Sequence, residues 1–212
     1  MPEPVEAETV ILWRAYVPRW SYLPLSGEGA ARFGGRWNPV GVPTIYAARE
    51  LSTAWAEYNQ GFVQHPALIA QLELAGARLA DLTDQQVLAD LGLDAGIHES
   101  QWRANLDGGK VPPTHASYRT LLALGFDGVI YPSFMSHGGT CVALWQWNKP
   151  GHPVLKVVDP EARLPASQRS WDLLQREPAA AFHARLAAQL GTDFELASVV
   201  HQHRRPHTGI DL

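Results

Sequence analysis

The sequence has one cysteine and no hydrophobic run long enough to span a membrane. Cys141 has no second cysteine with which to form a disulfide within the chain, which predicts a reducing, cytoplasmic compartment. It lies among apolar residues and is expected to be an inert buried thiol. The longest apolar runs have the length of single strands, so no membrane association is expected. Paired cysteines and the His-Glu-x-x-His pattern are missing, so we expect no metal site.

An excess of positive charge is missing as well. Lys plus Arg number 17 against 21 for Asp plus Glu, which gives a net charge of −4. Proteins that coat nucleic acid are usually basic, so direct nucleic-acid binding is not expected. Hydrophobic residues make up 46% of the 212 residues and charged residues 18%, which predicts a folded domain rather than a disordered chain.

Apolar patterning predicts more strands than helices. We expect strands at 9–17, 43–48, 67–74, 127–131, 141–147 and 154–158, and helices at 51–60 and 117–124. The stretches 18–42 and 98–113 are expected to be irregular, and 79–93 to be a loop with a short helix. Six or seven strands with few intervening helices favour a single α+β domain over a doubly wound sheet.

Two stretches stand apart from this pattern. The composition shifts after Pro160, which suggests a domain over 1–160 and an Ala-rich extension over 161–212 that packs on it, with two helices expected across 161–188. The irregular stretch 18–42 is too long for an ordinary loop and is expected to be functional. Its large apolar residues are expected to be buried: Trp20, Tyr22, Leu23, Leu25, Phe33 and Trp37.

Charged residues in unusual places are the first candidates for a site. Arg14 interrupts an apolar strand, and Arg36 lies between Gly35 and Trp37. Each is either a solvated surface charge or part of an anion site; two arginines near aromatic side chains suit a pyrophosphate linked to flat rings. Glu57 falls at the edge of the apolar face of the 51–60 helix, where a surface glutamate is the simplest interpretation.

Several short motifs follow one another along the chain. They are Trp13–Arg14, Pro24–Arg32 (PLSGEGAAR), Gly34–Pro39 (GGRWNP), Ile45–Ala48 (IYAA), Ala54–Tyr58 (AWAEY), Phe126–Gly128 (FDG) and Tyr131–Ser133 (YPS). Tyr46 follows Arg36 by ten residues, and Glu57 follows Tyr46 by eleven. From about residue 10 to 158 the chain resembles the RES-domain family, the toxin halves of RES–Xre toxin–antitoxin pairs.

The resemblance implies both a fold and a set of site residues. The implied fold has a mixed, mainly antiparallel sheet like that of the ADP-ribosyltransferase toxins, with the C-terminal helical extension added to it. The catalytic Arg, Glu and Ser that name the family match Arg36, Glu57 and Ser133. Substrate-binding positions match a further set of residues: Arg14, Tyr46, Trp37 and Asn38.

The implied activity is cleavage of NAD⁺ between nicotinamide and ribose, which builds positive charge on the ribose. Glu57 is expected to stabilise that charge. Arg36 and Arg14 are expected to bind the pyrophosphate. Tyr46 is expected to stack on nicotinamide, and Ser133 to bond its amide or a ribose hydroxyl. Phe134 and Met135 follow Ser133 where many relatives carry a basic residue. The sequence therefore does not decide whether this loop contacts a phosphate.

The resulting hypothesis is a toxin that degrades NAD⁺ by hydrolysis or phosphorolysis and arrests growth. NAD⁺ is its substrate, and no cofactor is expected. A cognate Xre-like helix-turn-helix antitoxin is the expected partner, with a homodimer of the toxin within the complex. The alternatives are a protein ADP-ribosyltransferase and a non-catalytic nucleotide-binding module. The sequence leaves the acceptor open among water, phosphate and a protein side chain.

Overall fold

The computed structural model describes residues 9–60, 65–99 and 101–167, and the structural statements below concern these residues. The chain divides into two compact units, Met1–Gln168 and Arg169–Leu212, and every described residue belongs to the first. The two helices expected across 161–188 fall mostly outside the described residues. The described part of that stretch, 161–167, contains turns and bends and no helix.

The described residues form strands and short helices, with most of the helices between the fourth and the fifth strand. The strands are β1 (Val10–Tyr16), β2 (Ile45–Ala48), β3 (Leu68–Ala75), β4 (Leu79–Asp81), β5 (Gly128–Pro132), β6 (Thr140–Leu144) and β7 (Val154–Val157). The α-helices are α1 (Glu28–Phe33), α2 (Leu51–Asn59), α3 (Gln85–Asp90), α4 (Trp102–Asp107) and α5 (Pro113–Ala123), with 3-10 turns η1 (Pro18–Trp20) and η2 (Ala95–Glu99). The six predicted strands, the helices predicted at 51–60 and 117–124 and the short helix predicted within 79–93 are confirmed. β4 and α1 were not predicted, and the expectation that 98–113 is irregular was wrong, because this stretch contains α4.

The seven strands form one sheet in the order β4-β5-β6-β2-β1-β3-β7. β4 and β5 run parallel, and the other neighbouring strands pair antiparallel. The sheet is therefore mixed and mainly antiparallel, which confirms the predicted α+β class. None of the described helices is long and apolar enough to cross a membrane.

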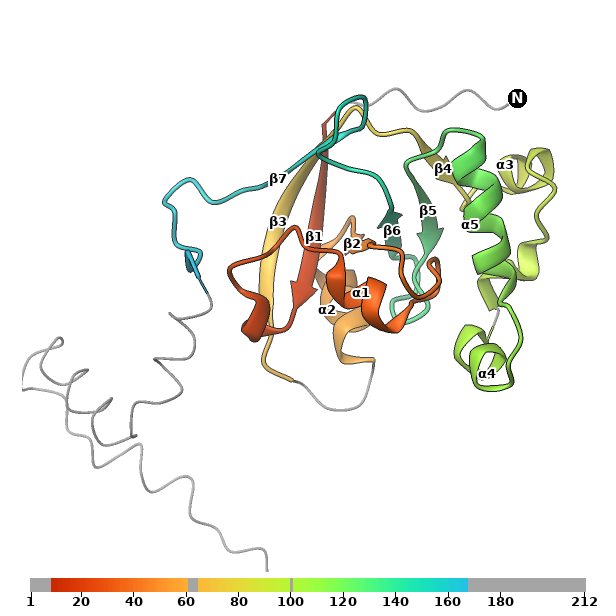
Figure 1. Ribbon diagram of the computed structural model, residues 1–212, viewed down its shortest axis with the longest axis horizontal. Coiled ribbons are helices and arrows are strands. Elements are labelled where there is room, and N and C mark those ends of the chain that lie inside the picture. Colours follow the sequence, from red (N-terminus) through yellow and green to blue (C-terminus); the bar gives the residue numbers. More distant parts are fainter. Residues whose placement is uncertain (1–8, 61–64, 100, 168–212) are drawn as a thin grey trace, which may run out of the picture. The chain divides into compact units, whose positions relative to one another are not determined.

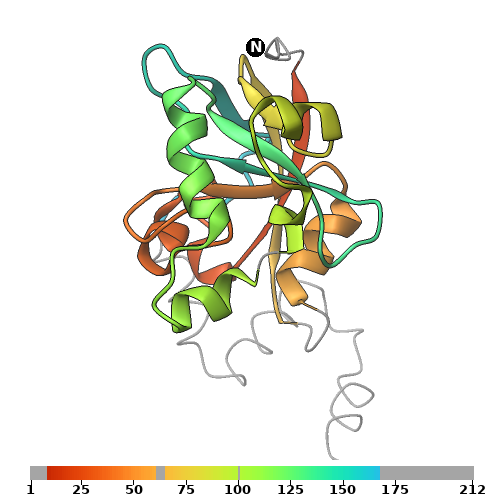
Figure 2. The ribbon, with the colours of Figure 1, turned by 90° about the vertical axis from the view of Figure 1, so that its right-hand side faces the viewer.

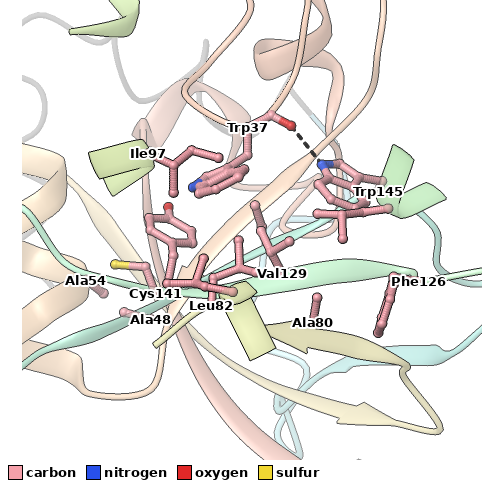
Figure 3. Packing of buried hydrophobic residues seen from close by; sticks show 14 residues of the cluster. Trp37, Ala48, Ala54, Ala80, Leu82, Ile97, Phe126, Val129, Cys141 and Trp145 are labelled. Carbon is pink, nitrogen blue, oxygen red and sulfur yellow. Dashed lines mark hydrogen bonds between the residues drawn. The ribbon is translucent and has the colours of Figure 1, made fainter. Parts of the chain in front are cut away.

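Both faces of the sheet are covered. Val129 and Tyr131 of β5 pack in a cluster with residues of α2, α3 and α5, whereas Ile130 between them packs on the opposite face with Leu12 and Leu72. This alternation follows from the two-residue period of a strand. Figures 1 and 2 show α3 and α5 beside β4 and β5, and Figure 3 shows the first cluster, in which Trp37 lies close to Ile97. The apolar runs of the central strands are therefore explained by burial on two sides.

The strands β1 and β2 separate near the centre of the sheet. β1 pairs with β3 over seven residues, but it meets β2 at one register pair, Trp13 with Ala48. Figure 2 shows β2 crossing β1 rather than running alongside it. The sheet thus opens at its middle, and this opening is where the site described below is found.

The stretch 18–42 differs from its prediction. It contains α1 and η1 and is not wholly irregular. Trp37 is fully buried, but Trp20, Leu23 and Phe33 are 44%, 41% and 72% exposed, so the expectation that all its large apolar residues are buried was wrong. Hydrogen bonds order this stretch together with apolar burial. Asn38 Nδ2 donates to three backbone carbonyls, those of Ala30, Pro39 and Val42.

Candidate functional site

A cavity of about 830 Å³ lies at the opening between β1 and β2. Residues of both strands line it, together with residues of α2, α4, η2 and the loops after α1 and β5. Four predicted site residues line the cavity: Arg14, Arg36, Tyr46 and Glu57. Three others, Trp37, Asn38 and Ser133, are not among its lining residues. The structure thus distinguishes the predicted residues that line the cavity from those that do not.

Glu57 is held by the loop that follows β5. Its Oε1 accepts hydrogen bonds from Ser133 Oγ at 2.7 Å and from the backbone amides of Phe134 at 3.0 Å and Met135 at 3.3 Å. Within the described residues, Oε2 of this carboxylate has no hydrogen-bond partner. Glu57 is therefore not the surface glutamate that its helical position suggested: one oxygen is fixed and the other is left for a ligand.

Ser133 is not among the residues that line the cavity, but its hydroxyl belongs to the same hydrogen-bond network as Glu57. Besides donating to Glu57, its Oγ accepts from the backbone amides of Met135 at 3.2 Å and Ser136 at 2.9 Å. Its own amide donates to the carbonyl of Gly139 at 2.8 Å, which closes the loop. These contacts engage the hydroxyl with the protein itself, so the geometry favours a role in orienting Glu57 over a contact with substrate.

Arg36 presents a half-buried charge to the cavity. Its guanidinium carbon lies 5.6 Å from the centre of the Phe134 ring, within the range of a cation–π contact. Among the described residues, no carboxylate lies within ion-pair distance of it. A guanidinium that is partly desolvated and has no acidic partner is suited to bind an anion.

The backbone around Arg36 is fixed by Tyr46. The hydroxyl of Tyr46 donates to Asn38 Oδ1 at 2.7 Å and accepts from the amide of Trp37 at 2.8 Å. Burial raises the pKa of Tyr46 well above its ordinary value, so the hydroxyl keeps the proton that it donates. Gly35 leaves the room for this contact, because a Cβ there would lie 2.5 Å from Tyr46 Oη.

Trp37 anchors the other side of the same loop. Its side chain is fully buried, its ring lies 5.5 Å from that of Tyr131, and its carbonyl accepts from Trp145 Nε1 at 3.0 Å (Figure 3). His115 Nε2 donates to the neighbouring carbonyl of Gly35 at 2.7 Å. Trp37 and Asn38 therefore shape the loop that carries Arg36, and their predicted substrate contacts stay a prediction.

Arg14 is half-buried, as Arg36 is. Its Nη1 and Nη2 donate to the carbonyls of Pro24 and Ser26, each at 2.8 Å. Burial lowers the pKa of Arg14 to about 10, because the charged form is desolvated. No acidic partner offsets this charge in the described part of the chain. An anion in the cavity would supply the missing compensation.

Comparison with known proteins identifies the family of this site. The family model of the RES domain matches residues 11–173. The chain belongs to the RES domain family. Within the described residues of this RES domain, no group of three or more His, Cys, Asp or Glu side chains is placed to hold a metal ion.

Two kinds of relative of this RES domain are known. The NAD(+) phosphorylases MbcT of Mycobacterium tuberculosis and Mycobacterium bovis are each 28% identical to it over 167 residues, covering 72% of this chain and 85% of the relative. The crystal structure of the M. tuberculosis MbcT-MbcA toxin-antitoxin complex contains a chain with a TM-score of 0.53 and 22% identity, covering 79% of this chain and 90% of that one. This structural match shows a shared fold.

The RES domain also places residues at the cavity that sequence reasoning missed. His98 and Tyr131 line it, as does Phe134 at 72% exposure. His98 lies in a stretch that was predicted to be irregular, and Tyr131 in a strand that was predicted only as core. Burial is the main cause that lowers the pKa of His98; the bond to the Leu82 carbonyl raises the pKa in part, and nearby Arg36 lowers it by the smallest amount. Tyr131 belongs to the Tyr131–Ser133 motif, but that motif gave it no role of its own, and no sequence motif marks His98.

Proposed function

We propose that this RES domain is a toxin that cleaves NAD⁺ between nicotinamide and ribose and transfers the ADP-ribose unit to phosphate. The observation that carries the proposal is the Glu57 carboxylate, fixed through Oε1 and open at Oε2, in a cavity with two arginines that lack acidic partners. This combination suits a substrate that has an anionic centre and develops positive charge during the reaction. The names of the relatives favour phosphate as the acceptor.

Glu57 acts on the reacting carbon. As the bond from ribose C1′ to nicotinamide breaks, its electron pair moves to the ring nitrogen, and positive charge builds on the ribose. The free Oε2 of Glu57 stabilises this charge, and phosphate then forms the new bond to C1′. Ser133 serves the step by holding Oε1, so that the carboxylate needs no reorientation.

The arginines bind the rest of the substrate. Arg36 contacts the pyrophosphate, and Arg14 adds a second positive charge from the β1 side of the cavity. Tyr46 supplies an aromatic wall while its hydroxyl keeps the Arg36 loop in place. The cavity of about 830 Å³ is at the large end of ligand pockets, as a dinucleotide requires.

A cognate antitoxin is expected to control this activity. We propose a small Xre-like helix-turn-helix protein as the partner, with a toxin homodimer in the complex. The support is that the structurally similar chain was solved in a toxin-antitoxin complex. Size measurement of the co-expressed pair tests the assembly, and a stable complex that cleaves NAD⁺ at the full rate would contradict it.

Purified protein incubated with NAD⁺, with and without phosphate, tests the reaction itself. We expect nicotinamide and a phosphorylated ADP-ribose when phosphate is present, and a marked loss of turnover without it. Chromatography distinguishes the alternatives: free ADP-ribose at an equal rate in both samples indicates hydrolysis, and ADP-ribose attached to protein indicates a transferase. NAD⁺ binding without any product indicates a non-catalytic module. In cells, induced expression is expected to lower NAD⁺ before growth stops.

A further inference from the structure

Three polar atoms without hydrogen-bond partners belong to three neighbouring rings, those of Trp37, His98 and Tyr131. His98 Nδ1 and Trp37 Nε1 are buried and have no hydrogen-bond partner in the described part of the chain. The hydroxyl of Tyr131 also makes no hydrogen bond to any described residue; it is not one of the fully buried atoms, and it belongs to a residue that is 6% exposed and lines the cavity. The Trp37 ring lies 6.4 Å from that of His98 and 5.5 Å from that of Tyr131. Buried polar groups are nearly always paired, so such a cluster calls for an explanation.

Two of these atoms belong to residues that line the cavity, and their hydrogen-bonding roles are fixed. His98 Nε2 lies 2.8 Å from the Leu82 carbonyl oxygen, which only accepts, so Nε2 carries the proton and Nδ1 of the neutral ring is an acceptor. The lowered pKa of His98 keeps the ring neutral at pH 7. Burial raises the pKa of Tyr131 far above its ordinary value, so its hydroxyl remains a donor.

We propose that His98 Nδ1 and the Tyr131 hydroxyl bind the carboxamide of the nicotinamide ring. His98 accepts a hydrogen bond from the amide N–H, and Tyr131 donates one to the amide oxygen. A primary carboxamide offers both a donor and an acceptor, which matches the acceptor and donor roles of these two residues. The assignment rests on the proposed cleavage of NAD⁺ and adds to it the two residues that select the leaving group.

The position of Tyr131 places this pair beside the reacting bond. Tyr131 lies two residues before Ser133 and opposite Cys141 in the register of β5 and β6. Cys141 Sγ in turn lies 3.8 Å from Glu57 Oε1. A carboxamide held by Tyr131 therefore sets the nicotinamide ring next to the carboxylate that acts on the ribose carbon bonded to it.

This pairing makes a prediction about which dinucleotides are cleaved. A methyl ketone in place of the carboxamide keeps the carbonyl but loses the N–H, and a carboxylate has acceptors alone. Sites that hydrogen-bond a substrate N–H discriminate strongly against analogues that lack it. We expect kcat/KM to fall by about tenfold for the methyl-ketone analogue of NAD⁺ and by about a hundredfold for the carboxylate analogue.

The variant His98→Leu tests the acceptor. If Nδ1 accepts from the amide, this variant should lose about tenfold in kcat/KM for NAD⁺ and nothing further for the methyl ketone, so that the two substrates become equivalent. A purely structural role for His98 would lower both rates alike and leave their ratio unchanged. An unchanged ratio in the folded variant would overturn the assignment of His98.

The variant Tyr131→Phe tests the donor and keeps the ring against Trp37. We expect nicotinamide, titrated calorimetrically as the free product, to bind about tenfold more weakly, while pyridine, which lacks the carbonyl, binds unchanged. Tyr118→Phe is the matched control, because its half-buried ring packs edge-on against Trp145 and does not line the cavity. Equal affinities of nicotinamide for wild type and Tyr131→Phe would overturn the assignment of Tyr131.

The failures of this inference and of the proposed function are distinguishable. Wild-type protein that leaves NAD⁺ intact contradicts the function and the inference together. Wild-type protein that cleaves NAD⁺ while the variants keep its ratios and affinities contradicts the inference alone. If His98→Leu does not fold, Tyr131→Phe still decides, because it removes one oxygen atom and retains the packing.

Discussion

At the scale of single residues, Glu57 and Arg36 have separable roles. The Glu57→Gln variant keeps an amide oxygen that accepts from the loop after β5 but removes the charge. We expect NAD⁺ binding to change little and turnover to fall by on the order of a hundredfold or more, since the charge is needed in the transition state. Calorimetry beside single-turnover kinetics measures both, and normal turnover in this variant would show that the charge of Glu57 is not used in the reaction.

Arg36→Ala is expected to give the opposite result. Loss of a charge-assisted contact with the pyrophosphate typically costs ~1.5–3 kcal/mol, so affinity for NAD⁺ should fall roughly ten- to a hundredfold. Arg119→Ala is a suitable control, because this exposed arginine does not line the cavity. Equal losses of affinity in both variants would indicate a general charge effect and not a specific contact.

Ser133 provides a test of positioning. In Ser133→Ala, Glu57 Oε1 loses its shortest hydrogen bond, at 2.7 Å, but keeps the two backbone amides. Turnover should fall by about tenfold while NAD⁺ affinity stays near that of wild type, because a hydroxyl engaged with the protein does not contact the ground-state substrate. Ser133→Thr retains a hydroxyl and should recover most of the turnover. A loss confined to affinity would instead support direct substrate contact.

The sequence motifs predict which residues lie at this site better than they predict what each residue contacts. Arg36, Tyr46 and Glu57, which were matched by their offsets, all line one cavity. The same motif places Trp37 next to Arg36, but adjacent residues point in different directions, and the indole is buried in the core. The bond of Ser133 to Glu57 joins residues 76 positions apart, so only the folded chain reveals it.

At the scale of elements, the loop from Gly35 to Asn38 has no room for a side chain at Gly35. A Cβ at Gly35 would lie 2.5 Å from Tyr46 Oη and 2.7 Å from Asn38 Oδ1, atoms that are hydrogen-bonded to each other. Gly35→Ala is expected to lower the free energy of unfolding by about 1–3 kcal/mol and to weaken NAD⁺ binding, because the loop carries Arg36.

Gly29→Ala is the control for this change. Gly29 lies within α1, and nothing lies within 4 Å of a Cβ placed there. Alanine is the better helix former, so the variant should be as stable as wild type or more stable by up to about 1 kcal/mol. Denaturant unfolding of the two variants measures the difference, and equal stabilities would show that the loop adapts to the added methyl group.

The elements that were predicted and those that were missed differ in how they are stabilised. β5 and β6 are buried on both faces, so their apolar runs are visible in the sequence. β4 has three residues and depends on parallel pairing with β5, 49 residues further along the chain at Leu79 and Gly128. The helices α1 and α4 have six residues each and no buried ones, so they leave no apolar period to detect.

At the scale of the whole molecule, the thiol of Cys141 reports on folding. It is 2% exposed, and burial, with a smaller effect of nearby Glu57, raises its pKa to about 12. An unfolded cysteine titrates near pH ~8.5. Between these values the unfolded chain loses the proton and the folded chain keeps it, so stability is fully present below pH ~8.5 and falls as the pH rises toward about 12, by up to about 1.4 kcal/mol per pH unit.

Denaturant unfolding between pH 8 and 10 measures this slope, and Cys141→Ala should lack it. The window ends at pH 10 because Tyr46 and Tyr131, whose pKa values are also raised, add slopes of the same sign above their ordinary range. Cys141 lines the cavity but is 2% exposed, so thiol reagents should modify it slowly in the folded state. The same slope in wild type and Cys141→Ala would show that the thiol titrates normally in the folded state.

The distance along the chain between Glu57 and Ser133 also has a consequence for biosynthesis. At ~5–20 residues per second, a ribosome needs on the order of ten seconds to add the residues that separate them. β2, already made by then, cannot take its place in the sheet before β6 emerges to pair with it. Under the proposed function, each chain is therefore harmless to the cell that makes it until translation of β6 is complete. An antitoxin that is already present has that interval in which to meet it.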